Sequence, residues 1–471
     1  MIRKLLFKGC RTLANVIVLT GIGTTILSSA AFNQVTPNPH GDCRVQSVDY
    51  RGWQAQQVSN RWLQLVIVPQ NGGRLMQVTF AGHPFLFVNP KLAGKYMPPT
   101  SARWFNYGGD KVWLLPEGNN DEEHWVGDSD VLDDGPFTFQ KISEGKLCTV
   151  GLVGPADPQT GIQFARTISI EADSPVIHFH ATMKNVTGHT LDWSMQSVSQ
   201  YDTSNRGVTD QSGPAINHDF WAFTSANPAS SYLNRYHVRF GPAENPAVSV
   251  RDDGLFALHY VHMAAELWLD STDGWLAVVD GSSRYAMVER FQYEQARPYP
   301  GKASVIFWTN GPEARLNADG EMSLSKDPDA SPYYLEAELN SPMCHLRAGE
   351  SCNFDTDWFP TRAGTEVHCV SEAGILIRPL RATPLPEGKV NIAGTFGVFF
   401  SGRLIAHFYD EHGTALAITQ LMDVNPDETV SLQKQVVLSG KASRVSLHLV
   451  DEAGVDRGAL QEVRVLPEEN R

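Results

Sequence analysis

The sequence predicts an all-β protein made of a large antiparallel β-sandwich followed by a small one. Short runs rich in Val, Ile, Thr, Phe and Trp recur along the chain, separated by turn residues among its 39 Gly and 28 Pro. No stretch keeps a helical period beyond a few turns. The hydrophobic content of 42% and the charged content of 19% are typical of a globular chain and exclude a disordered one.

The first 31 residues differ from the rest and predict a secretory signal peptide. Four basic residues precede or enter an apolar start, residues 13–27 are uncharged and largely apolar, and small residues at 28–31 suit cleavage. An uncleaved N-terminal anchor is the alternative, although polar and glycine positions interrupt the apolar run. We therefore expect an exported protein, periplasmic or extracellular, with no stable transmembrane segment after leader cleavage.

The charge of the chain limits its partners. Loss of the leader removes four basic residues and no acidic one, so the net charge falls from −14 to −18. A chain this acidic, without a basic stripe, is not expected to bind nucleic acid. The sequence has no Walker loop, dinucleotide fingerprint, nucleophile elbow or zinc-type cysteine spacing, so no cofactor and no metal are expected. The oligomeric state is left open.

The chain divides into segments by composition. Residues 32–51 form a polar lead-in, and the stretch 52–365 contains roughly fifteen or more predicted strands, which favours a sandwich of unusually large antiparallel sheets. Residues 370–467 hold six or seven short strands at the spacing of a small Ig-like β-sandwich. We expect this second unit to be an accessory or packing module.

Five cysteines remain after the leader, so at least one stays unpaired or pairs between chains. Export makes disulfides possible. Cys344 and Cys352 flank a turn at 347–349, and we expect them to form a disulfide that joins the two sides of a hairpin.

The strand predicted over 333–339 alternates strictly between apolar and polar residues. Leu335, Ala337 and Leu339 share one face, whereas the other face presents an aromatic residue followed by Glu336 and Glu338. Two carboxylates at this spacing lie roughly 6–7 Å apart. Such a face suits a polar, hydroxyl-rich ligand, and a solvated strand face is the alternative.

The large unit resembles the galactose-mutarotase-like (aldose 1-epimerase-like) superfamily, and more narrowly an uncharacterised bacterial domain family within it. The resemblance covers roughly residues 55–362 and rests on the order and spacing of four stretches, at 68–75, 106–113, 185–201 and 333–359. It implies a galactose-mutarotase-like β-supersandwich that holds a sugar or glycan over its concave sheet without a cofactor.

The resemblance also implies catalytic roles. In mutarotases a Glu takes the proton of the anomeric hydroxyl and a His protonates the ring oxygen. By position Glu336 matches the catalytic Glu, and Glu338 stands where the family usually has Gln. Tyr107 occupies the place of a family His, and its ordinary pKa of about 10 makes it a weak acid at neutral pH. A histidine from another strand, such as His178 or His259, is left open as the acid.

Sugar-binding residues follow from the same stretches. The Gly-Gly loop offers Asn106, Asp110, Lys111 and Trp113, since aromatic faces stack on sugar rings while Asp and Asn bond hydroxyls. A tight turn with core aromatics is the alternative reading of this loop. Further candidates are Gln200, Glu338 and Arg74, of which the last is as readily explained by a structural ion pair.

Two other clusters have weaker interpretations. Residues 117–125, with Asp128 and Asp130, could hold Ca²⁺ through oxygen ligands, but a solvated loop is the simpler reading because no calcium-loop spacing is present. Glu289 and Glu294 lie in a region that borders the cleft in the relatives and are secondary candidates.

These observations support two functions. The first is an exported carbohydrate-recognising protein that acts as a cofactor-free epimerase or mutarotase with Glu336 as base. The alternative is a non-catalytic carbohydrate-binding or interaction protein, which the missing family histidines favour. Glycan cleavage would need a second carboxylate across the cleft, such as Glu289 or Asp110, because two residues of one strand cannot flank a glycosidic bond.

Overall fold

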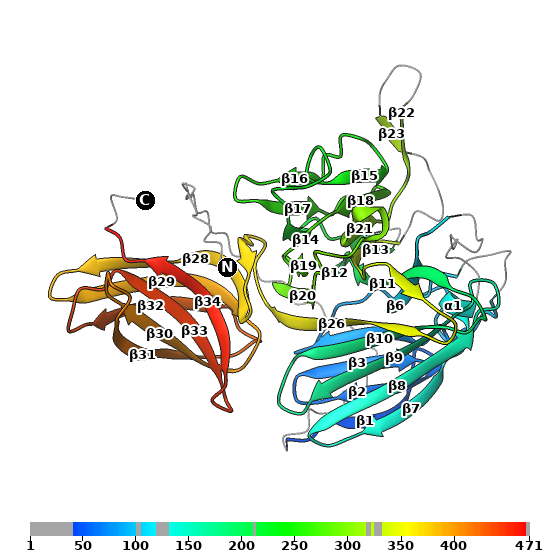
Figure 1. The fold of residues 1–471 in the computed structure, drawn as a ribbon, viewed down its shortest axis with the longest axis horizontal. Coiled ribbons are helices and arrows are strands. Elements are labelled where there is room, and N and C mark those ends of the chain that lie inside the picture. Colours follow the sequence, from blue (N-terminus) through cyan, green and yellow to red (C-terminus); the bar gives the residue numbers. More distant parts are fainter. Residues whose placement is uncertain are drawn as a thin grey trace.

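The computed structural model describes residues 41–99, 105–118, 131–210, 213–316, 322–324 and 332–467, so the predicted signal peptide lies outside it. Apart from the short helix α1 (Val131–Asp134) and the 3₁₀ turn η1 (Pro300–Lys302), the named elements in these ranges are β-strands. Their pairings are antiparallel throughout (Figure 1). The predicted all-β class is confirmed.

Among the described residues, no helix is long and apolar enough to cross a membrane.

The larger sheet has twelve strands. In spatial order they are β1 (Arg44–Tyr50), β2 (Trp53–Ser59), β3 (Leu63–Val68), β4 (Arg74–Phe80), β6 (Asp110–Leu115), β11 (Leu191–Asp202), β24 (Tyr334–Asn340), β21 (Val305–Thr309), β18 (Ala265–Leu269) and β15 (His237–Phe240), with β5 (His83–Pro84) beside β4 and β25 (Cys344–Leu346) beside β11. Strands thus begin at Arg44, earlier than residue 52, because the polar segment 44–50 pairs as an edge strand with β2.

The second sheet has ten strands. They are β16 (Val248–Val250), β17 (Leu255–His259), β14 (Phe220–Ser225), β19 (Trp275–Asp280), β20 (Tyr285–Phe291), β26 (Ser351–Arg362), β10 (Ile177–Asn185), β9 (Ile162–Glu171), β8 (Leu147–Ala156) and β7 (Thr138–Ser143). Apolar side chains of the two sheets, among them Leu335 and Leu339 from one and Met287 and Trp358 from the other, form one core. The sheets therefore pack face to face as a sandwich.

Two hairpins extend from this sandwich. They are β12 (Ser204–Asp210) with β13 (Gly213–Ile216), and β22 (Ala314–Leu316) with β23 (Met322–Leu324).

The C-terminal residues form two further sheets of four strands each. One contains β27 (Cys369–Val370), β28 (Gly374–Leu385), β29 (Lys389–Val398) and β32 (Val430–Val437); the other contains β31 (Ala415–Val424), β30 (Gly402–Tyr409), β33 (Arg444–Asp451) and β34 (Asp456–Arg464). They enclose a core of their own that includes Phe396, Phe408 and Leu447.

An apolar cluster joins the C-terminal sheets to the large sandwich. Ile375, Ile377 and Phe399 pack with Val288 and Phe359, which lie on β20 and β26 of the ten-stranded sheet. Figure 1 shows the C-terminal sheets beside these two strands. Burial of this apolar surface stabilises the contact between the two units. The contact lies on the ten-stranded sheet.

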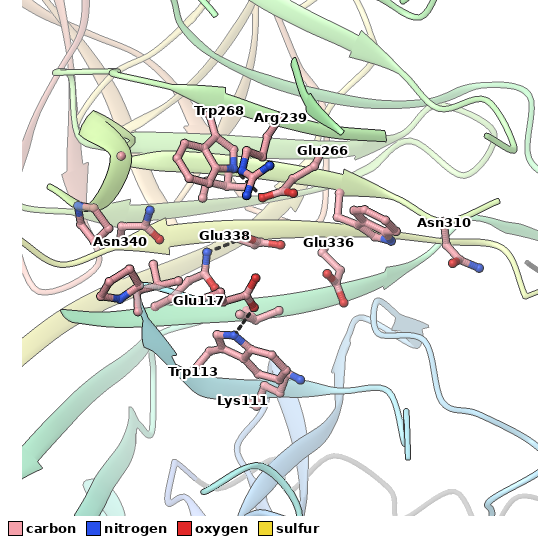
Figure 2. Close-up of a pocket in the computed structure, with 18 of the residues that line it drawn as sticks. Lys111, Trp113, Glu117, Arg239, Glu266, Trp268, Asn310, Glu336, Glu338 and Asn340 are labelled. Carbon is pink, nitrogen blue, oxygen red and sulfur yellow. Dashed lines mark hydrogen bonds between the residues drawn. The ribbon is translucent and has the colours of Figure 1, made fainter. Parts of the chain in front are cut away.

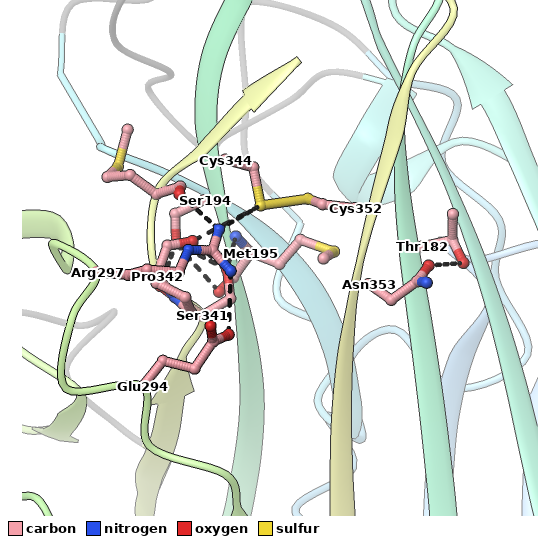
Figure 3. Close-up of a disulfide and its surroundings, with 11 residues drawn as sticks. Thr182, Ser194, Met195, Glu294, Arg297, Ser341, Pro342, Cys344, Cys352 and Asn353 are labelled. Carbon is pink, nitrogen blue, oxygen red and sulfur yellow. Dashed lines mark hydrogen bonds and ion pairs between the residues drawn. A yellow bond between two sulfur atoms is a disulfide. The ribbon is translucent and has the colours of Figure 1, made fainter.

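Two disulfides connect the sheets of the sandwich. Cys344 on β25 is bonded to Cys352 on β26, the pairing expected from the sequence (Figure 3). The two strands do not form the expected hairpin, because β25 pairs with β11 and β26 belongs to the ten-stranded sheet. A second disulfide, not expected from the sequence, joins Cys43, just before β1, to Cys148 on β8. Cys369 is a free thiol.

Candidate functional site

A cavity of about 400 Å³ opens on the face of the twelve-stranded sheet that points away from the sandwich core (Figure 2). Side chains from β6, β11, β24, β21, β18 and β15 line it, together with the loop after β6 and the turn η1. Its polar lining residues are Lys111, Glu117, Gln196, Arg239, Glu266, Asn310, Glu336, Glu338 and Asn340, and its aromatic ones are Trp113, Trp268, Trp308 and Tyr334. The site is therefore acidic and rich in aromatic surface.

Strand β24 places both candidate carboxylates in this cavity. Glu336 and Glu338 line it, whereas Leu335, Ala337 and Leu339 lie in the sandwich core, as the alternation of the sequence requires. In Figure 2 the two carboxylates project from β24 between the side chains of β18 and those of β6.

Antiparallel register extends the site sideways across the sheet. Glu336 pairs with Trp308 on β21, and Trp308 pairs with Glu266 on β18, so these three side chains form a row on the cavity face. On the other side Glu336 pairs with Gln200 of β11. Gln200 and Glu336, which are 136 positions apart in sequence, thus become neighbours because their strands pair.

A second row runs parallel to the first. Glu338 pairs with Ile306 on one side and with Val198 on the other, and Val198 pairs in turn with Lys111 of β6. On β18, Trp268 pairs with Ile306 and completes the row. The two rows together form a floor in which carboxylates alternate with aromatic and aliphatic surface.

Neutral donors hold the four cavity carboxylates in place. Gln200 donates from Nε2 to Glu336 Oε1 at 2.5 Å, and Gln196 donates from Nε2 to Glu338 Oε2 at 2.5 Å. Indole nitrogens bind the other two carboxylates. Trp113 Nε1 donates to Glu117 Oε1 and Trp268 Nε1 donates to Glu266 Oε1, each at 2.5 Å. None of these four bonds supplies a positive charge to its carboxylate.

Burial and mutual repulsion separate the proton affinities of the two β24 carboxyls. Burial raises the pKa of Glu338 well above its ordinary value, and the charges of Glu336, Glu266 and Glu117 raise it further. Burial also raises the pKa of Glu336, but the Lys111 ammonium and the Gln200 amide oppose this. Of the two carboxyls Glu338 therefore holds a proton more strongly, because Lys111 and Gln200 favour the ionised form of Glu336.

Lys111 lines the cavity but its charge is already engaged. Its Nζ lies 3.1 Å from Asp133 Oδ1 and 3.3 Å from the centroid of the Trp113 ring. Arg74 also binds Asp133, at 2.6 Å, and lies 3.8 Å from Asp134. Arg74 is fully buried in this ion-pair group and does not line the cavity, which favours the structural alternative for this residue.

The Gly-Gly loop has the conformation that its sequence requires. Gly108 and Gly109 have φ of 88° and 79°, and a Cβ at Gly108 would approach the Phe87 carbonyl oxygen to 2.2 Å. Asn106 uses its Oδ1 to accept from the Gly108 amide. The loop thus positions the start of β6, and Asn106 lies outside the cavity lining.

Tyr107 does not reach the cavity. It packs in an apolar cluster with Trp53 and Met76, and its hydroxyl accepts from the Met97 amide at 2.8 Å. Burial raises the pKa of Tyr107 to about 12. Both its position and its pKa argue against the expected role as catalytic acid.

Asp110 is also placed differently from the expectation. It precedes Lys111 on β6, so its side chain points to the opposite face, where it is fully buried and forms an ion pair with Arg166. The hydroxyls of Ser197 and Ser199 lie 3.5 Å and 3.4 Å from Asp110 Oδ1. The same interior group includes Glu289, which accepts from Tyr201 at 2.6 Å. Neither carboxylate can face Glu336 across the cavity.

The histidines considered as an alternative acid lie elsewhere. His178 and His180 bind Asp357 and Asp355 through Nδ1, at 2.6 Å each, on the ten-stranded sheet. His259 contacts the His218 carbonyl oxygen. Within the described ranges, no histidine lines the cavity. Of the proposed calcium loop, residues 119–130 lie outside the described residues.

The structure adds site residues that the sequence reading missed. Glu266 and Trp268 occupy alternate positions of β18, the same pattern that identified Glu336 and Glu338 on β24. That pattern was available in the sequence, but it becomes significant only when β18 is known to lie two strands from β24. Glu117 was considered only as a calcium ligand.

We expect Glu289→Gln to remove part of the pH dependence of stability. Burial raises the pKa of Glu289 from 4.5 to about 8, and the Asp110 charge adds to this. The folded state keeps this proton where the unfolded chain has lost it, so its contribution to stability is complete below the unfolded pKa and is lost as pH rises through the folded one. Between about pH 5.5 and pH 8 one such group accounts for on the order of 3 kcal/mol.

Urea unfolding of the parent and the variant at these two pH values measures the effect. Glu289→Gln should be more stable than the parent at the higher pH and should depend less steeply on pH. Equal pH dependence in the two proteins would contradict the assignment.

The fold and the cavity define the class of protein: an antiparallel β-sandwich with an acidic, aromatic-lined site on the outer face of its larger sheet. No protein-family model matches the chain, and no curated protein matches it. Among solved structures it is similar to a TPR-domain containing protein from Parabacteroides distasonis, with 15% identity and a TM-score of 0.45 over 68% of this chain and 49% of that chain.

Two other similar structures carry the name mutarotase in their descriptions. A galactose mutarotase-like protein from Clostridium acetobutylicum matches with 10% identity and a TM-score of 0.43, over 69% of this chain and 100% of that chain. A putative mutarotase from Salmonella typhimurium matches with 9% identity and a TM-score of 0.43, over 70% of this chain and 96% of that chain.

Proposed function

We propose that this protein is exported, binds a sugar in the cavity and interconverts its anomers without a cofactor, with Glu336 as the base. The observation that carries the proposal is the pair of adjacent carboxyls on β24 at the floor of an aromatic-lined cavity. Lys111 and Gln200 favour the ionised form of Glu336, whereas burial and nearby carboxylates favour the protonated form of Glu338. The two disulfides support export, because such bonds persist in oxidising compartments.

The lining suits a sugar ring. Trp113, Trp268 and Trp308 offer flat apolar faces to C–H surfaces, and the carboxylates accept hydrogen bonds from hydroxyls. A volume of about 400 Å³ lies within the usual range for small-molecule sites.

Adjacent groups on one strand suit this reaction. The anomeric hydroxyl and the ring oxygen are bonded to the same carbon, so a single face must serve both. Glu336 removes the hydroxyl proton, the bond between the anomeric carbon and the ring oxygen breaks, and the Glu338 carboxyl gives its proton to the ring oxygen. Rotation of the resulting aldehyde and reversal of the steps yield the other anomer, and the proton returns to Glu338.

The alternative is a non-catalytic carbohydrate-binding protein. It is supported by the lack of a histidine among the described cavity residues, since a family mutarotase uses one as its acid. In this case the same residues would bind the sugar, and no anomer exchange would occur.

The test begins with a panel of free sugars, screened by thermal shift and then by NMR exchange between anomers. We expect exchange faster than in buffer for a sugar that binds, and a loss of about 10²–10⁴-fold in Glu336→Gln, the usual contribution of a positioned acid or base. Exchange should also decline at high pH as Glu338 loses its proton.

Glu462→Gln is the matched control, because Glu462 lies on β34 and pairs with Arg444 far from the cavity. It should behave as the parent. Binding without exchange would establish the non-catalytic alternative, and a full screen without any sugar-induced shift would overturn both functions.

A further inference from the structure

The charges around the cavity do not balance. Four carboxylates line it, whereas the lining residues in the described part of the chain include only two cations, Lys111 and Arg239. Lys111 and Arg74 form ion pairs with Asp133 and Asp134, which offset their positive charges. Arg239 is exposed, with its guanidinium carbon 5.9 Å from the Trp268 ring. Burial raises the pKa of all four carboxyls, to about 7 for Glu117, and Arg239 opposes this at Glu266. The lining therefore holds few positive charges that favour the ionised form of its four carboxyls.

The lining also has more hydrogen-bond acceptors than donors available to a ligand. The side-chain nitrogens of Gln196, Trp113 and Trp268 already donate hydrogen bonds to the carboxylates. Asn340 is fully buried, lines the cavity and donates to the Ala303 carbonyl oxygen, but its Oδ1 has no partner. Apart from the exposed Arg239, the polar groups that remain for a ligand are thus mainly acceptors, and a buried acceptor without a partner is costly.

We infer that the sugar recognised by this cavity carries a free amino group, bound as an ammonium ion among Glu266, Glu336, Glu338 and Glu117. This inference rests on the proposed function and specifies its substrate class. An ammonium supplies three donors and the missing charge, and the Trp308 face can interact favourably with a cation. Acidic or phosphorylated sugars would face like charges, and N-acetylation would remove both the charge and two donors.

Binding of a cation has a second consequence that a neutral sugar would not share. A positive charge beside Glu338 favours its ionised form, so the carboxyl should release its proton when an amino sugar binds. Proton release therefore distinguishes a cation bound beside the carboxylates from one bound at the exposed rim.

Calorimetric titration with matched pairs of sugars tests the inference. Glucosamine, galactosamine and mannosamine are each compared with the parent hexose, with the N-acetyl derivative and with the corresponding uronate, below neutral pH. At least one amino sugar should bind more than tenfold more tightly than its parent hexose, a difference of about 1.4 kcal/mol. Its binding should weaken with added salt, and titrations in two buffers of different ionisation enthalpy should show proton release.

Glu338→Gln should reduce the preference for the amine over the parent hexose and abolish the proton release, and Glu462→Gln should change neither. Glu266→Gln, on another strand, provides a second variant should the first fail to fold. A parent hexose that binds as tightly as its amino form would overturn the inference and leave the proposed function in place. Failure of all sugars would overturn both, and equal binding of cyclohexylamine would show a cation site rather than a sugar site.

Discussion

Replacing both Cys43 and Cys148 with alanine should lower the free energy of unfolding by about 5 kcal/mol. The bond closes a loop of 105 residues, and the chain-entropy relation assigns about 4.8 kcal/mol to a loop of this length. It links the segment before β1, an edge strand of the twelve-stranded sheet, to β8 of the ten-stranded sheet. Without it the unfolded chain gains freedom, and the two sheets lose their covalent link at this edge.

The second disulfide provides the control. Cys344 and Cys352 are only 8 residues apart, so the same relation assigns about 2.5 kcal/mol to their bond. Urea unfolding of the two double-alanine variants should therefore differ by about 2 kcal/mol, with the first less stable. Equal losses, or a larger loss for the short loop, would show that loop closure does not set the ranking.

Arg166→Met should destabilise the protein by about 3–5 kcal/mol. Arg166 is 4% exposed and pairs with the fully buried Asp110 between the sheets. Its guanidinium also lies 4.4 Å from the centroid of the Phe179 ring. Loss of Arg166 leaves a carboxylate without its counter-ion in a site that water does not reach, which is more costly than loss of both charges.

A double-mutant cycle measures this difference. Asp110→Asn combined with Arg166→Met should recover part of the stability lost in the single variant. The exposed pair of Arg444 with Glu462 is the matched control, and Arg444→Met should cost less than about 1 kcal/mol. Additive effects in the buried pair would refute the coupling.

Strand alternation allowed part of the site to be read from the sequence. The segment 334–340 is regular enough that its two faces could be assigned before the structure was known, and Glu336, Glu338, Lys111 and Trp113 do line one cavity. The same rule places Asp110 opposite Lys111, so grouping both as sugar ligands contradicted the alternation. The expected role of Tyr107 rests on its position in the family motif, which carries no information about burial.

The sequence by itself determined the all-β class and the faces of its strands, because these depend on the local period of the chain. Only the tertiary structure decided that β18 and β21 extend the site beside β24, that Cys43 meets Cys148, and that Glu338 is buried among other carboxylates. Each of these follows from hydrogen-bonded register and packing between segments far apart in the chain, which local pattern does not specify.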